Sequence, residues 1–225
     1  MLEGKAAWSL AVIFLQLWDF TMRITENVCD FMPNFTLQTE NENENGFVQP
    51  FADSPTDDEN VSEHVYLHTI NNAKDYLFIE TPYFIVDDSF ISALILAAKS
   101  GVDVRLVFPY KWDKRLIKQI SKSYYSELIH GGVRIFEYLP GFIHSKVFLA
   151  DEKIAVVGSV NLDYRSLYHH FECATCLYNT SSIKELRLDF EQTFLDCKEI
   201  HLEDCKGNIF KRFWQSVLRI IAPIL

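Results

Sequence analysis

The chain lacks an uninterrupted apolar run long enough to cross a bilayer, which takes about 20 residues in a helix. The most apolar N-terminal stretch, Ala6–Trp18, is interrupted by Ser9 and Gln16. Glu3 and Lys5 cancel each other's charge, and no small-residue cleavage site follows. We therefore expect neither a transmembrane helix nor a signal peptide in this chain.

Positive charge is also scarce. The 225 residues include 21 Lys and Arg against 31 Asp and Glu, which gives a formal net charge of −10. Eight of the acids lie between Gln38 and Glu63, where there is no Lys or Arg, so the rest of the chain is close to neutral. A protein that binds duplex nucleic acid shows a basic patch instead. We expect no nucleic-acid partner.

The cysteines are few and scattered, which argues against a disulfide framework. Two of the five form a C-x-x-C within FECATCLY, but this stretch has the composition of a strand, and we expect structural, reduced thiols. We also find no His, Cys, Asp and Glu residues at metal-ligand spacing, and we expect no metal or other cofactor. The cysteines are Cys29, Cys173, Cys176, Cys197 and Cys205.

Three regions follow one another along the chain. Residues 3–20 predict a helix that is apolar nearly all round and that needs burial by something larger. Residues 25–60 are acidic and broken by prolines, so we expect a flexible linker. Strands and helices then alternate, which predicts an α/β sandwich with a mixed sheet flanked by helices. The expected strands are 76–81, 102–108, 133–139, 146–151, 153–159 and 171–178, and the expected helices are 61–73, 89–101, 112–130, 181–197 and 208–222.

The most informative stretch is HSKVFLADEKIAVVGSVNLD, residues 144–163. Side chains alternate faces along a strand, so His144 and Lys146 are expected to point the same way, and so are Ser159 and Asn161 at the end of the returning strand. Such a hairpin gathers a nucleophile or base, a fixed cation, a hydroxyl and an amide. These groups suit an anionic oxyacid, above all a phosphate.

The spacing H-x-K-x4-D-x6-G-S-x-N resembles the signature of the phospholipase D superfamily. The matching residues are His144, Lys146, Asp151, Gly158, Ser159 and Asn161. The resemblance implies a phospholipase D-type sandwich and a metal-free phosphodiester transfer through a phosphohistidine.

The resemblance also implies a role for each site residue. His144 is the expected nucleophile, and Lys146, Ser159 and Asn161 are expected to hold the phosphate oxygens. Asp151 is expected to brace the backbone of the site rather than act directly. Glu172, 28 positions after His144, is expected to hydrogen-bond and orient its imidazole.

Further stretches narrow the resemblance to bacterial cardiolipin synthases, over essentially the whole chain. They are TPYF (81–84), SGVDVRLVFP (100–109), Asp113-Lys114, SKSYYSELIHGGVRIFEY (121–138), GFIHSK, NLDYRS (161–166), HFE (170–172) and RIIAPIL, with AAWSL and FVQPFADSP nearer the N-terminus. The implied reaction joins two phosphatidylglycerol molecules into cardiolipin and free glycerol. The implied place is the cytoplasmic face of the cell membrane, on anionic lipid.

The chain departs from that family in carrying one motif instead of two. It resembles the C-terminal half alone: a residual helix from a first half (1–24), an acidic linker (25–60) and a phospholipase D-like domain (61–225). Because the family uses two histidines, we expect a homodimer or another chain to supply the other motif. Two alternatives stay open, a homodimeric single-motif phosphodiesterase or nuclease and an inactive membrane-binding fragment.

Two basic segments and a histidine pair also have alternative interpretations. Residues 111–123 form either a solvated helix face or a guide for anionic headgroups. Residues 209–225 form either a membrane-surface helix or a helix docked on the core. His169 and His170 lie near the motif, and at least one of them is expected to be merely exposed or packed.

Overall fold

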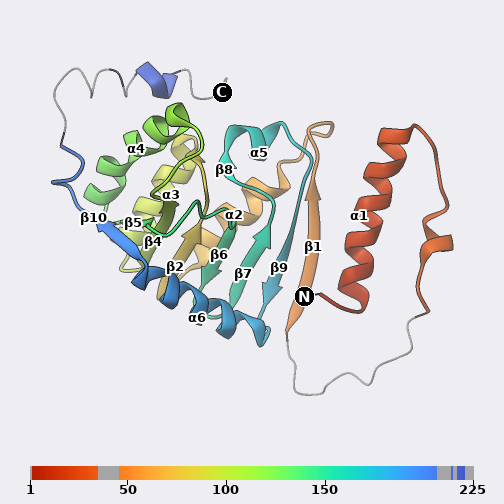
Figure 1. The fold of residues 1–225 in the computed structure, drawn as a ribbon. Helices are drawn as coiled ribbons and strands as arrows, with labels where there is room; N and C mark the ends of the chain where they lie inside the picture. Colours follow the sequence, from red (N-terminus) through yellow and green to blue (C-terminus); the bar gives the residue numbers. More distant parts are fainter. Residues whose placement is uncertain (1, 35–45, 207–213, 215–216, 221–225) are drawn as a thin grey trace.

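The computed structural model of the chain describes residues 2–34, 46–206, 214 and 217–220. Its body is an eight-stranded mixed sheet between two helical layers (Figure 1). The helices α2, α3 and α4 cover one face of the sheet, and α6 covers the other. The predicted α/β class, with a mixed sheet flanked by helices, is confirmed.

The helices and strands follow one another in this order: α1 (Lys5–Met22), the 3-10 helix η1 (Val28–Phe31), β1 (Phe47–Asp53), α2 (Val61–Asn72), β2 (Tyr76–Glu80), β3 (Phe84–Ile85), α3 (Asp88–Lys99), β4 (Asp103–Pro109), α4 (Arg115–His130), β5 (Arg134–Tyr138), β6 (Val147–Ala150), β7 (Ile154–Gly158), β8 (Leu162–Asp163), α5 (Tyr164–Tyr168), β9 (Glu172–Tyr178), α6 (Ser182–Leu195) and β10 (Cys197–Ile200).

The strand order in the main sheet is β1-β9-β7-β6-β2-β4-β5-β10. The strands β2, β4 and β5 run parallel, and the remaining pairings are antiparallel. The centres of the parallel strands are apolar because helices cover both of their faces, as in Leu77–Ile79 of β2 and Leu106–Phe108 of β4. A separate two-stranded pairing joins β3 to β8 and thereby brings the segment after β2 next to the segment after β7.

Each face of the sheet has its own apolar core. The larger core lies under α2, α3 and α4 and includes the stacked rings of Tyr66 and Phe148, 3.9 Å apart between centroids. The smaller core lies under α6 and is centred on Phe78 and Phe190. Both cores reach the β6–β7 hairpin, so the hairpin that carries the motif is held from two sides.

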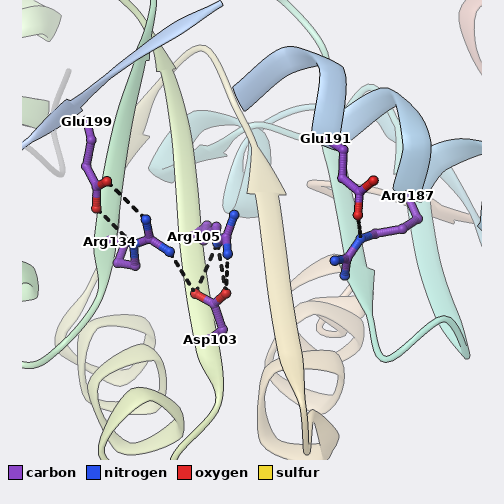
Figure 2. Close-up of polar contacts among 6 residues, drawn as sticks. All are labelled: Asp103, Arg105, Arg134, Arg187, Glu191 and Glu199. Atoms are coloured by element: carbon purple, nitrogen blue, oxygen red, sulfur yellow. Dashed lines mark hydrogen bonds and ion pairs between the residues drawn. The ribbon is translucent and has the colours of Figure 1, made fainter. Parts of the chain in front are cut away.

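Ion pairs on the α6 side join the far edge of the sheet, as Figure 2 shows. Arg134 on β5 donates to Glu199 on β10 at 2.8 Å and lies 3.7 Å from Asp103 on β4. Arg105 donates to the same Asp103 carboxylate, and its guanidinium lies 4.9 Å from the ring centroid of Phe194 on α6. These contacts attach α6 and β10 to the parallel strands.

The expectation of a linker over residues 25–60 is wrong for residues 47–53, which form the edge strand β1 paired with β9. Pro50 is compatible with this position because an edge strand has one side free of ladder hydrogen bonds. Asp53, counted among the linker acids, is buried and accepts a 2.8 Å hydrogen bond from the backbone N–H of Ser62. It therefore satisfies a free donor in the first turn of α2.

Two smaller expectations also need correction, and a third lies mostly outside the described residues. The helix expected to begin at Ser89 begins at Asp88, and its N-cap is Asp87, whose carboxylate accepts from the N–H of Phe90. The helix expected over 181–197 ends at Leu195, and the chain continues into β10. Most of the helix expected at 208–222 lies outside the described residues. Within the described part, Leu218 is buried in the larger core and Arg219 bonds to Glu127 on α4 at 2.8 Å.

Helix α1 lies beside β1 at the edge of the sheet (Figure 1). Its only buried residue is Leu15, whereas Phe14 is 61% and Phe20 59% exposed. The full burial that its apolar sequence led us to expect is thus not found within this chain. No helix among the described residues is both long and apolar enough to span a membrane.

Candidate active site

The motif begins just before β6 and continues past the end of β7. Between these strands, Asp151 and Glu152 adopt left-handed conformations, with φ of 53° and 49°, as in the tight turns that favour β-hairpins. The hairpin therefore returns the chain within the three residues 151–153. Its open end carries His144, Lys146 and Ser159, and its closed end carries Asp151.

Asp151 has a structural role in this arrangement. Its carboxylate accepts hydrogen bonds from the backbone N–H groups of Lys74, Asp75 and Tyr76 at 2.7, 2.8 and 2.9 Å. The length of β6 separates it from His144. The geometry agrees with a brace for the start of β2 and gives Asp151 no contact with the reacting groups.

His144 and Lys146 meet at the open end of the hairpin. The Nζ atom of Lys146 lies 3.1 Å from Nδ1 and 3.2 Å from Nε2 of His144, and it donates to the backbone carbonyl of His144 at 2.7 Å. Lys146 is buried, while His144 is exposed. Partial burial and the Lys146 charge lower the pKa of His144, and Asp113 opposes them. The lowered pKa favours the neutral imidazole, the form in which a histidine can act as a nucleophile.

Lys146 is itself balanced between two acids. Burial lowers the pKa of its ammonium, and the charges of Glu172 and Asp163 raise it. A buried lysine with carboxylates nearby is a fixed positive charge, and such a charge can hold the oxygens of a phosphate.

The expected hydrogen bond between Glu172 and His144 is not present. Glu172 instead accepts a short hydrogen bond from the Ser159 hydroxyl, and its other oxygen lies 3.8 Å from Nδ1 of His170. Ser159 Oγ also accepts from the backbone N–H of Cys173 at 3.1 Å. Glu172 begins β9, directly beside the end of β7, so its nearest partners are the residues that follow β7.

Ser159 and Asn161 do not share a face as expected. Asn161 donates from Nδ2 to Ser166 Oγ at 3.1 Å, and its Oδ1 is buried without a hydrogen-bond partner among the described residues. Asn161 lines a cavity of about 210 Å³, whose wall also includes Tyr83, Lys114 and Arg165. Ser159 faces a different hollow, beside α1.

The 210 Å³ cavity contains residues that motif spacing alone did not identify. Its charged lining comprises Lys114, Arg165, His170 and Asp163. Lys114 Nζ lies 5.2 Å from the ring centroid of Tyr83, whose hydroxyl donates to Asp113 at 2.6 Å. Of these residues, Asp113, Lys114 and His170 had a signal in the sequence, through the family resemblance or their position next to the motif. Tyr83 and Arg165 lie within the quoted stretches TPYF and NLDYRS but had no assigned role.

Two other basic residues of segment 111–123 have partners outside this cavity. Lys122 pairs with the buried Glu137 at 2.8 Å, and Lys118 donates to the carbonyl of Tyr110 at 3.2 Å. Only Lys114 of this segment's basic residues lines the cavity. Elsewhere in the described part of the chain, no three His, Cys, Asp or Glu side chains converge as metal ligands would.

The fold and site place the chain among phospholipase D-type proteins. The phospholipase D family member Nuc of Salmonella typhimurium superposes with a TM-score of 0.57 at 19% identity, over 69% of this chain and 99% of that one. The phosphatidylserine synthase of Haemophilus influenzae gives a TM-score of 0.66 at 13% identity, over 80% of this chain and 48% of that one.

The sequence defines the family more narrowly. Residues 66–194 match the model described as "Cardiolipin synthase, PLD-like domain". Cardiolipin synthase 2 of Bacillus anthracis is 38% identical over 225 residues, covering 100% of this chain and 43% of that protein. The chain belongs to the family of cardiolipin synthase phospholipase D-like domains. It spans a little under half the length of the curated relatives it matches.

Proposed function

We propose that the chain contributes one of two half-sites to a phosphatidyl transfer that makes cardiolipin and glycerol from two phosphatidylglycerol molecules. The observation that carries the proposal is the His144–Lys146 pair beside a cation-lined cavity, in a chain of the cardiolipin synthase family. The pair supplies a neutral imidazole and a fixed positive charge within one hydrogen-bond length of each other. Attack on a phosphodiester needs both.

The reaction proceeds in two displacements. A ring nitrogen of His144 attacks the phosphorus of one phosphatidylglycerol, the bond from phosphorus to the glycerol oxygen breaks, and the leaving oxygen takes up a proton. The terminal hydroxyl of a second phosphatidylglycerol then attacks the phosphohistidine and loses its proton. The nitrogen–phosphorus bond breaks, cardiolipin forms and His144 is restored.

The remaining site residues stabilise the charge on phosphorus in this scheme. Lys146 neutralises the phosphate oxygens, and the amide of Asn161 donates to them. The hydroxyl of Ser159 donates to them after it turns away from Glu172, to which it donates in this structure. Glu172 holds Ser159 in place and balances the charge of Lys146. The proton for the leaving glycerol comes from a second histidine.

We further propose that this second histidine belongs to a second copy of the chain or to another polypeptide that carries the other motif. The departing glycerol oxygen needs an acid to protonate it, and His144 cannot attack the phosphorus and donate this proton at the same time. The reaction takes place at the cytoplasmic surface of the cell membrane, where anionic lipid supplies the substrate.

A single-motif phosphodiesterase acting on nucleic acid is the second candidate. The fold resemblance to Nuc, which this chain covers almost completely, favours it. The net charge of −10 opposes it, because phosphate backbones are bound by basic surfaces.

The test is to incubate the purified protein with phosphatidylglycerol vesicles and to measure cardiolipin and free glycerol by mass spectrometry. The variant His144→Ala should abolish both products, and His68→Ala, on α2 and outside the motif, should leave them unchanged. A phosphatidyl adduct on His144 in rapidly quenched samples would support the covalent step. The proposal is refuted if the protein is folded and bound to vesicles but makes no cardiolipin even when a chain with the other motif is added. Cleavage of plasmid DNA would favour the second candidate.

A further inference from the structure

An apolar groove runs between α1 and the β1–β9 edge of the sheet and ends at the motif. Its volume is about 540 Å³, within the roughly 300–1,000 Å³ typical of small-molecule sites. One wall is the apolar side of α1, and the other includes Ala52, Phe171 and Cys173. Ser159 and Glu172, the hydrogen-bonded pair beside Lys146, also line this groove.

The wall formed by α1 has the spacing of one helix face. Leu10, Ile13, Leu17 and Phe20 follow one another at intervals of three or four residues, and Phe14 lies four residues after Leu10 and three before Leu17. In an ordinary surface helix such a stripe packs on the core, but here Leu17 is 38% and Phe14 61% exposed. The contact of Phe20 with Phe171, 5.4 Å between ring centroids, joins the two walls.

The motif therefore separates two hollows of opposite character. Asn161 faces the cavity lined by Lys114 and Arg165, while Ser159 faces the apolar groove, whose lining includes no Lys or Arg. Lys146 is affected by the charges of both Asp163 on the cavity side and Glu172 on the groove side. A molecule with its phosphate at Lys146 meets cations on one side and hydrocarbon on the other.

We propose that the groove between α1 and the β1–β9 edge holds one acyl chain of the phosphatidyl group while its phosphate lies at His144 and Lys146. This inference rests on the proposed function and assigns to α1 a part in substrate binding. Continuity with the motif favours a lipid tail over a second protein, because the groove ends at the residues that would hold the phosphate. The charged side chains of the groove are the carboxylates of Asp53 and Glu172, and both already accept hydrogen bonds within the protein, Asp53 from the N–H of Ser62 and Glu172 from Ser159, so a tail that passes them leaves these bonds in place.

The test is photo-crosslinking with phosphatidylglycerol that carries a diazirine at the end of one acyl chain, presented in phosphatidylcholine vesicles. Adducts mapped by mass spectrometry are expected on residues 10–20 of α1 and on Ala52 and Phe171. His144→Ala should keep these adducts, since binding does not need the nucleophile. The labelling experiment can therefore refute acyl-chain binding in the groove without refuting the catalytic role of His144, and the reverse. Adducts confined to other exposed apolar residues, such as Leu188 and Leu195 on α6, would overturn the groove.

A pair of leucine variants tests the wall directly. Leu17→Ser should lower labelling of the groove about tenfold, as expected when one apolar contact of this size is lost. Leu96→Ser on α3, where Leu96 is 63% exposed and outside the groove, should have no effect. Three results together would show that the groove is a protein interface and that the proposal is wrong. The wild type would sediment as a dimer, Leu17→Ser would sediment as a monomer, and no adduct would form on α1.

Discussion

The ammonium nitrogen of Lys146 lies within 3.2 Å of both ring nitrogens of His144. Partial burial lowers the pKa of His144, and the charge of Lys146, which would lie in contact with a protonated imidazole, lowers this pKa further. The lysine thus favours the neutral form of the histidine as well as being placed to bind phosphate. This double effect gives a physical reason for the H-x-K spacing.

Replacing Lys146 with methionine should raise the pKa of His144 toward its ordinary value of about 6.5. The neutral imidazole would then form at a higher pH, so any activity left in the variant should begin to rise at a higher pH than in the wild type. NMR titration of the His144 ring protons measures the pKa without any need for turnover. Lys153→Met, at the closed end of the hairpin, is the matched control. A His144 pKa that is equal in wild type and Lys146→Met would contradict the argument.

Sequence patterns predicted most of the central sheet because its determinants are local. The run Tyr76–Ile79 is apolar, and residues 77–80 are buried between two helical layers. The helix α4 ends at His130, as expected, and is followed by Gly131 and by Gly132, whose φ of 97° favours glycine. The residues of the motif were identified from their spacing in the sequence. This was possible because the motif lies on a single hairpin, whose two strands bring both ends of the motif together.

Features that depend on distant pairing were not predictable in the same way. The strand β1 contains Pro50 and lies between two acidic stretches, and it becomes a strand because β9, more than 100 residues later, offers it an edge. The partner of Glu172 likewise depends on where β9 begins relative to β7, and this placed Ser159 and not His144 beside its carboxylate. Tyr83 and Lys114 meet at the cavity because β3 pairs with β8.

Asp151→Ala should destabilise the fold without direct effect on the reacting groups. The substitution removes an acceptor shared by three backbone N–H groups at Lys74, Asp75 and Tyr76. We expect a loss of about 1–3 kcal/mol in the free energy of unfolding, because partly solvated donors regain some bonding from water. Urea titration measures it, with Asp58→Ala in the exposed loop before α2 as the control. A midpoint that shifts no more than that of Asp58→Ala would show that the brace is unimportant.

Gly158→Ala should disturb the end of β7. A Cβ atom at this position would overlap Ala174 and the backbone carbonyl of Cys173 on the neighbouring strand. We expect a destabilisation of about 1–3 kcal/mol, as for other overpacked sites, and a loss of activity because Ser159 follows directly.

The matched control for this substitution is Gly141→Ala, where an added Cβ atom meets nothing within 4 Å. Thermal unfolding compares the two variants. Equal melting temperatures would mean that β7 and β9 separate without cost, which would remove the steric reason for glycine at this position of the motif.

Glu80 gives the clearest expected pH dependence of stability. It is 4% exposed, and it accepts a 2.5 Å hydrogen bond from Ser145, the residue between His144 and Lys146. Burial raises the pKa of its carboxyl, and the Ser145 bond only partly opposes this. The folded protein therefore holds the proton more tightly than the unfolded chain does. The wild type should lose stability as the pH rises from about 4.3, the ordinary pKa of glutamate, through the raised folded-state pKa.

Glu80→Gln removes this ionisation and keeps an acceptor for Ser145. Urea titrations at about pH 4 and about pH 7 should show a variant that gains stability relative to the wild type as the pH rises, since only the wild type must keep a buried proton or bury a charge. Glu185→Gln, on an exposed position of α6, should show no such gain. If the difference between Glu80→Gln and the wild type is constant across this range, the Glu80 carboxyl ionises alike in the folded and unfolded states. Ser145 would then donate its hydrogen bond to a carboxylate whose pKa is that of an ordinary glutamate.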